Sequence, residues 1–159
     1  MRPEFRIFVS SVQKELAEER RAVRDFVQGD PLLRRYFSVF LFEDLPASDR
    51  RADDVYLKEV DRSDVYLGLF GREYGAADGN ASSPTEREFD RATAKGKTRL
   101  IFVKGSDDKG RDPRMLQLIR RAGDELIRRR FQGVTDLTAA VYANLVDHLE
   151  YTGRLRTLP

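Results

Sequence analysis

Short apolar runs alternate with segments of helical periodicity over most of this 159-residue chain. The runs are bounded by polar or turn residues and occupy residues 6–10, 38–43, 65–71 and 99–105. Their near-continuous apolar character is typical of parallel strands that are buried on both faces. The alternation predicts an α/β domain with three layers, in which helices cover both faces of a doubly wound parallel sheet with strand order 2-1-3-4-5.

The last third of the chain continues this pattern. A helix is predicted to begin at Asp112 and Pro113, and residues 129–133 predict a short edge strand. A closing helix carries apolar residues at helical spacing: Leu137, Val141, Leu145 and Leu149. A chain of this length builds one ordinary domain. We assign residues 1–150 to it and treat residues 151–159 as a tail, or as a linker to a further domain.

The composition excludes several classes of function. The chain has no cysteine and a single histidine, His148, so no metal site is predicted. Its 29 basic and 27 acidic residues nearly cancel, and we interpret the arginines between residues 120 and 130 as a solvated face. No segment resembles a signal peptide or approaches the ~20 apolar residues of a membrane span. We expect a cytoplasmic protein without membrane or nucleic-acid partners.

Two long irregular segments, residues 71–83 and 104–112, each follow a predicted strand and precede a predicted helix. In a doubly wound sheet, such loops lie at the carboxyl edge of the strands, where ligands bind. Residues near the strand ends and at the start of the next predicted helix are therefore predicted to line one crevice: Ser10, Ser11, Asp44, Gly71, Arg72, Glu73, Tyr74, Glu86 and Glu88. Two of them have an alternative role, because Ser10 with Gln13 would cap the first helix and Tyr74 would serve as a packing ring.

The stretch "SSPTEREFDRATAKGK", residues 82–97, places two glutamates at the start of a predicted helix. Ser83, Pro84 and Glu86 fit a capping box, with a hydroxyl N-cap, a proline at the first helical position and a carboxylate that reaches back. Glu86 therefore has a structural explanation.

Glu88 lies beyond the capping positions, next to Phe89 on the apolar stripe. Near a helix N-terminus, its carboxylate would be kept ionised by the helix dipole. The structural alternative is an ion pair with Arg91 or Lys95 on an exposed helix edge, which is worth about 0.5 kcal/mol.

Other catalytic and nucleotide-binding motifs are incomplete. The stretch "KGKT", residues 95–98, lacks the first glycine of a phosphate-binding loop and ends a predicted helix instead of opening one. Residues 6–10 carry no acidic pair that would hold the magnesium ion of a phosphoreceiver domain. No G-x-S-x-G elbow surrounds Ser10 or Ser11, which argues against a serine hydrolase.

Three stretches in this order, "RIFVSSVQKELAEER", "VDRSDVYLGLFGREYG" and "SPTEREFDRATAKGKTRLIFVK", resemble an uncharacterised bacterial TIR-like family. Its pattern is I-F-[IV]-S-S, then S-D-[IV]-x-[IL]-G-[IL]-x-G-x-x-Y-G, then S-x-T-E-x-E-[FY]-x-x-A. The resemblance extends over about the first two thirds of the chain. It implies a flavodoxin-like, TIR-like fold, related to TIR domains and to nucleoside 2-deoxyribosyltransferases.

In those relatives a glutamate, followed by a small or apolar residue and by an alanine four positions on, acts on an N-glycosidic bond. Glu88, Phe89 and Ala92 fit this spacing, whereas Pro84 and Thr85 stand where the TIR pattern has an aromatic residue and a cysteine. The resemblance thus implies a nucleotide-binding domain that cleaves or transfers the N-glycosidic bond of NAD or a nucleoside, with Glu88 as the catalytic residue. The substrate-binding residues would be Ser10, Ser11, Asp44, Gly71, Arg72, Tyr74, Thr85 and Glu86.

No cofactor is expected, because NAD or another nucleotide would be the substrate. The alternative function is a non-catalytic signalling or interaction module at the N-terminus of a larger multidomain protein. Members of the resembled family often precede helicase-like, Schlafen-like or NTPase modules. This implies self-association or a fused effector domain as partners.

Overall fold

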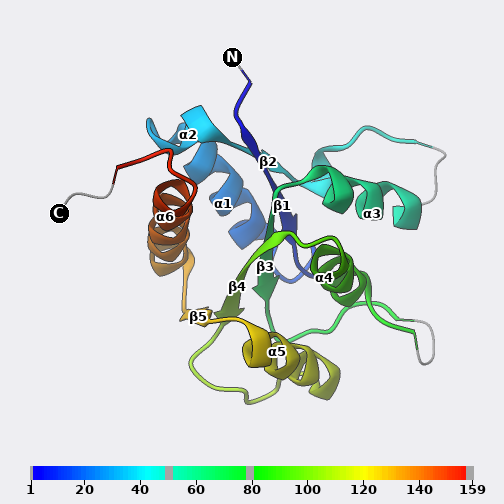
Figure 1. Ribbon diagram of the computed structural model, residues 1–159. Helices are drawn as coiled ribbons and strands as arrows, with labels where there is room; N and C mark the ends of the chain where they lie inside the picture. Colours follow the sequence, from blue (N-terminus) through cyan, green and yellow to red (C-terminus); the bar gives the residue numbers. More distant parts are fainter. Residues whose placement is uncertain (1, 49–51, 78–80, 157–159) are drawn as a thin grey trace.

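The computed structural model describes residues 2–48, 52–77 and 81–156 (Figure 1). Its strands form one parallel sheet in the order β2-β1-β3-β4-β5, which confirms the predicted topology. The predicted short edge strand is present as β5. The strands are β1 (Phe5–Ser10), β2 (Phe37–Phe40), β3 (Val65–Phe70), β4 (Thr98–Lys104) and β5 (Arg128–Phe131).

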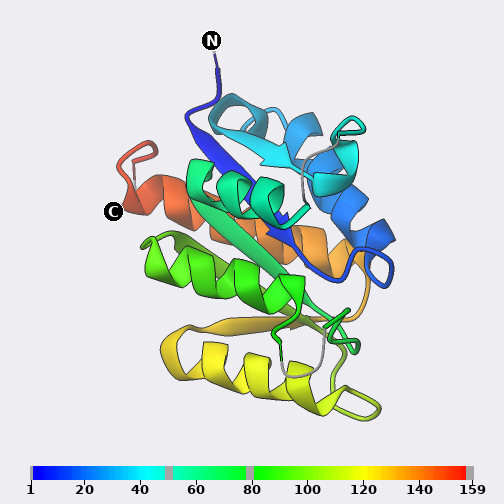
Figure 2. The same ribbon diagram turned by 90° about the vertical axis from the view of Figure 1, so that its right-hand side faces the viewer.

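Helices cover both faces of the sheet, as Figures 1 and 2 show. One face carries α1 (Ala17–Gly29), α2 (Leu33–Tyr36) and α6 (Val134–Tyr151), and the other carries α3 (Ala52–Arg62), α4 (Pro84–Ala94) and α5 (Pro113–Glu125). A single 3-10 turn, η1 (Phe42–Asp44), follows β2. Both α2 and η1 are too short to be predicted from periodicity. Within the described residues, no helix has the length and apolar character that crossing a bilayer requires.

The two faces of the sheet have separate hydrophobic cores. Ile7 and Val9 of β1 belong to the core under α1 and α6, whereas Phe8 belongs to the core under α3, α4 and α5. Because side chains alternate along a strand, the last residue of β1, Ser10, shares the face of Phe8 and is directed toward α4. Every residue of the central strand β3 is buried.

The first helix begins later than predicted. Residues 13–16 form a turn, in which the Leu16 N–H donates to the Val12 carbonyl at 3.1 Å, and α1 begins at Ala17. The interpretation of Ser10 as a helix cap is therefore wrong, because its hydroxyl is bound to another group. The two predicted proline starts are confirmed, since α4 and α5 each begin with a proline that follows a capping side chain.

Candidate active site

The centre of the candidate site is a buried contact between the end of β1 and the beginning of α4. The Ser10 hydroxyl donates to Oε1 of Glu88 at 2.6 Å, across 78 residues of sequence. Ser10 is fully buried and Glu88 is 8% exposed. The alternation of side chains in β1 and the start of α4 at Pro84 bring these two groups together.

A cavity of about 270 Å³ has Glu88 in its lining. Most of its surface is apolar, and its lining includes Phe42, Tyr56 and residues 75 and 76 of the β3–α4 loop. Its lining comes from five separate segments: Ser11, Val12, Gln13, Phe42, Ala52, Tyr56, Gly75, Ala76, Pro84, Thr85 and Glu88. The predicted site residues Ser11, Thr85 and Glu88 therefore lie at one cavity, and Ser10 lies against the carboxyl group.

Burial raises the pKa of Glu88 to about 7, against the opposing effects of the Ser10 hydrogen bond and of the charges of Arg20 and Arg87. The expectation that this group stays fully ionised is therefore wrong, because loss of hydration on burial is the largest effect on its pKa. The alternative of a surface ion pair is wrong as well. Glu88 is buried, and Arg91 instead binds both carboxylate oxygens of Asp61 at 2.7 Å.

A buried arginine, Arg20, connects the segments that lie next to the site. The Arg20 side chain is 2% exposed, and two of its nitrogens donate to the two carboxylate oxygens of Glu43 at 2.7 and 2.8 Å. Its third nitrogen donates to the Ser11 hydroxyl at 2.9 Å. This contact joins α1, the end of β1 and η1. The sequence carries one signal for it: Arg20 stands at helical spacing within the apolar stripe that includes Leu16 and Val23.

Glu86 and Tyr74 stabilise the beginning of α4. The Ser83 hydroxyl accepts from the Glu86 N–H at 3.2 Å, as the capping box requires. The return contact runs through a tyrosine, because the Ser83 N–H donates to the Tyr74 hydroxyl, which donates to Glu86, both at 3.1 Å. The Tyr74 ring lies under the guanidinium group of Arg114 at 4.6 Å. Both predicted site residues thus have structural partners.

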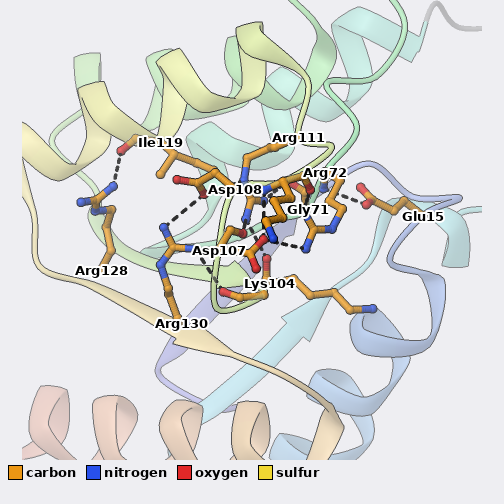
Figure 3. Close-up of polar contacts among 12 residues, drawn as sticks. Glu15, Gly71, Arg72, Lys104, Asp107, Asp108, Arg111, Ile119, Arg128 and Arg130 are labelled. Atoms are coloured by element: carbon orange, nitrogen blue, oxygen red, sulfur yellow. Dashed lines mark hydrogen bonds and ion pairs between the residues drawn. The ribbon is translucent and has the colours of Figure 1, made fainter.

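Gly71 and Arg72 belong to a polar network between the loops that follow β3 and β4 (Figure 3). The Arg111 guanidinium group has no exposed surface, and it donates to the carbonyls of Gly71, Lys104 and Asp107. The Glu15 carboxylate accepts from the Arg72 N–H at 2.8 Å. A Cβ atom at position 71 would lie 2.4 Å from this carboxylate, so only glycine allows this approach.

This network borders a second, more open hollow of about 850 Å³. Val12, Gly75 and Ala76 line both the hollow and the Glu88 cavity, so the two spaces adjoin. The hollow brings Arg72 and Tyr74 to the same region as Lys14, which the sequence analysis did not identify. Gly71 lies behind it, covered by Glu15.

Asp44 is placed elsewhere. Its two carboxylate oxygens accept from Arg24 at 2.7 and 2.8 Å, and its side chain is 49% exposed. The η1 turn directs this residue to the surface and presents Phe42 to the cavity instead. The expectation that Asp44 lines the same crevice as Glu88 is therefore wrong.

Titratable groups are sparse at the site. Among the lining residues that the structure describes, Glu88 is the only carboxylic acid of the cavity. The described parts of the chain also contain no group of three or more histidine, aspartate and glutamate side chains placed to hold a metal ion. The chemistry of the cavity therefore depends on one carboxyl group and its hydroxyl partner.

The fold and this site define an α/β domain with a buried carboxyl group at the carboxyl edge of its sheet. The chain belongs to the family described as Domain of unknown function (DUF4062), whose sequence profile matches residues 6–146. No curated protein matches the sequence significantly.

Two solved structures were found to be similar to this chain, and one of them superposes with a TM-score above 0.5. The Clostridium botulinum CMP N-glycosidase BcmB superposes with a TM-score of 0.56 at 10% identity, over 87% of this chain and 98% of that one. Oxidised flavodoxin 1 from Bacillus cereus gives a TM-score of 0.48 at 14% identity, over 91% of this chain and 97% of that one. At these identities the similarity concerns the fold alone.

Proposed function

We propose that this domain binds a nucleotide in the Glu88 cavity and cleaves or transfers its N-glycosidic bond. The observation that carries the proposal is a buried carboxyl group, held by a serine hydroxyl at 2.6 Å, on a residue that lines a mostly apolar cavity. The shared fold with a CMP N-glycosidase and the resemblance to TIR-like and deoxyribosyltransferase families support the same chemistry. Glu88 is the catalytic residue in this proposal.

The reaction breaks the bond between C1′ of the ribose and a nitrogen of the base. Both bonding electrons leave with the base, and the positive charge that develops on the ribose is stabilised by the Glu88 carboxylate or captured as an ester. A water molecule, or a second acceptor hydroxyl, then adds to C1′ and releases its proton. Ser10 orients the carboxylate through Oε1 and leaves the other oxygen to face C1′.

The type of base follows from the single acid of the cavity. A neutral base must take up a proton as it leaves, whereas a cationic base such as nicotinamide leaves as a neutral molecule without one. Among the described lining residues, no second carboxyl group is present to supply that proton. We therefore place NAD-type substrates, with a cationic base, ahead of ordinary nucleosides.

The alternative is a non-catalytic module that senses a nucleotide or binds a partner domain. One observation favours it: a carboxyl group with a pKa of about 7 is half protonated at neutral pH, and a protonated acid stabilises no cation. In this function, the cavity would accept an uncharged ring against a protonated Glu88.

Base release separates the two functions. The purified protein, dilute and forced to cluster, is incubated with NAD, CMP and deoxynucleosides, and free base is measured by chromatography. We expect release from wild type, none from Glu88→Gln, and wild-type release from Glu18→Gln, which removes an exposed carboxylate of α1. Release by Glu88→Gln at the wild-type rate would reject the catalytic assignment. Binding without release in every condition would establish the sensing module.

A further inference from the structure

The Tyr66 hydroxyl is a buried polar group next to the site. Tyr66 lies in the central strand β3 and is 1% exposed, and its hydroxyl oxygen has no hydrogen-bond partner among the described residues. An unsatisfied hydroxyl in a core costs about 1–3 kcal/mol, and phenylalanine would fill the same space without this cost. The hydroxyl is therefore expected to have a use that packing does not provide.

A glycine gives the Tyr66 ring room to extend toward the site. Gly68 pairs with Ser10 in the register between β1 and β3. A Cβ atom at Gly68 would lie 3.0 Å from Cε1 of Tyr66, so the ring occupies the space of the missing side chain. Phe89 packs edge-on against the ring at 5.9 Å. The hydroxyl end of Tyr66 thus reaches the level of Ser10, beneath α4.

The strand register brings the Tyr66 ring beside Gly68, the partner of Ser10, and Ser10 is bound to Glu88. Burial is the largest effect and raises the pKa of Tyr66 well above its usual range, so the group keeps its proton. Interaction with the Ser10 hydroxyl lowers this pKa, and the charge of Glu88 raises it. The other charges that act on Tyr66 or Glu88 are Arg20 of α1 and Arg87 and Asp90 of α4, and Tyr56 of α3 lines the same cavity.

We propose that Tyr66 is a positioning residue that acts on Glu88 through Ser10. A serine hydroxyl has one hydrogen to donate and two lone pairs that accept. Ser10 donates its hydrogen to Glu88, so its lone pairs can accept from the unpaired Tyr66 hydroxyl, and this hydrogen bond is the contact that we infer. The chain from Tyr66 through Ser10 to Glu88 polarises the Ser10 hydroxyl and stabilises the ionised carboxylate, which is the form that the proposed reaction needs.

The direct test is a pH titration of Glu88, measured by NMR on its carboxyl carbon. The resonance is assigned by its absence from the spectrum of Glu88→Gln. Tyr66→Phe removes one oxygen and keeps the ring, and we expect it to move the midpoint upward by about one pH unit. Tyr74→Phe is the matched control, because its hydroxyl binds Ser83 and Glu86 instead. This control should lose stability and leave the Glu88 midpoint in place.

The catalytic consequence rests on the proposed function. If the ionised form reacts, base release by Tyr66→Phe should fall about five-fold at pH 7 and return to the wild-type rate near pH 9. An unchanged Glu88 midpoint in Tyr66→Phe would overturn the inference, whether or not the protein releases base. A shifted midpoint in a protein that never releases base would support the chain and reject the glycosidase.

Ser10→Ala, a smaller change at another buried position, provides a second test. Removing the Ser10 hydroxyl should by itself raise the midpoint of the Glu88 titration. Tyr66→Phe added to Ser10→Ala should cause no further shift. Equal midpoints in Ser10→Ala and wild type would contradict the chain. Additive shifts from the two substitutions would contradict it as well.

Discussion

The two polar regions at the carboxyl edge of the sheet treat buried charge in opposite ways. In the loops after β3 and β4, Arg111 is surrounded by carbonyl and carboxylate acceptors, and Glu15 accepts from two backbone N–H groups. In the adjoining cavity, Glu88 is held by one serine hydroxyl, and burial shifts its pKa to about 7. The fully paired charges of Arg111 and Glu15 stabilise the loops, whereas the poorly paired carboxyl group of Glu88 is available for chemistry.

The largest effect on stability should come from the paired region. Arg111→Met leaves the carbonyls of Gly71, Lys104 and Asp107 without their donor, and it should lower the free energy of unfolding by about 3 kcal/mol or more. Arg128→Met is the control, since that exposed side chain donates to the Ile119 carbonyl alone among the groups drawn in Figure 3, and its loss should cost less than about 1 kcal/mol. Similar losses from both variants, measured by urea unfolding, would remove the distinction between the two regions.

In the poorly paired region, removing the charged group should raise the free energy of unfolding instead of lowering it. The pKa of Glu88 is raised from its usual 4.5, so the unfolded chain ionises first and stability is lost as the pH rises from about 4.5 to 7. The shift corresponds to about 3 kcal/mol at most. Glu88→Gln, which cannot ionise, should therefore match wild type at pH 4 and be more stable by up to this amount at pH 8. A variant that is less stable than wild type at pH 8 would show that the carboxylate is well paired.

Gly71 tests how tightly the paired region is built. Gly71→Ala places a methyl group within 2.4–2.7 Å of the Glu15 carboxylate and should cost about 1–3 kcal/mol. Because the clash is with one flexible side chain, Glu15→Ala should relieve most of the added cost in the double variant. Thermal unfolding of the four proteins measures this coupling, and simple additivity would place the strain elsewhere.

The smallest effect is expected from the acid that is two residues before Glu88. Glu86→Ala removes the acceptor of the Tyr74 hydroxyl at the start of α4 and should cost about 1 kcal/mol. The Glu88 titration and any base release should be unchanged, since no contact joins the two carboxyl groups among the described residues. A shift of the Glu88 midpoint in this variant would mean that the helix cap and the cavity are one unit.

The fold could be predicted because parallel strands that are buried on both faces give continuous apolar runs, and short right-handed crossovers leave few strand orders. The Ser83 cap and the position of Glu88 at the border of an apolar stripe could be predicted for the same reason, since both depend on local spacing. The Ser10–Glu88 contact was predicted only as a shared edge of the sheet. Its distance depends on how α4 packs over β1.

The contacts of the buried arginines could not be predicted from local patterns. The position of Arg20 in an apolar stripe indicates burial, but its partner Glu43 and the loops that enclose Arg111 depend on chain paths that no neighbouring residue specifies. Asp44 was misplaced because the η1 turn redirects the chain after β2. The pKa of Glu88 was misjudged because the helix dipole is a local property, whereas the loss of hydration depends on everything that covers the carboxyl group.

The rate of base release as a function of pH tests the central claim most directly. If ionised Glu88 stabilises the ribose cation, the rate should rise with pH through a midpoint near 7, where the carboxyl group loses its proton, and level off above it. Glu88→Gln should show no release at any pH, while its fold and nucleotide binding are retained. A rate that falls as the pH rises through 7, or release by Glu88→Gln with the wild-type pH dependence, would contradict the account.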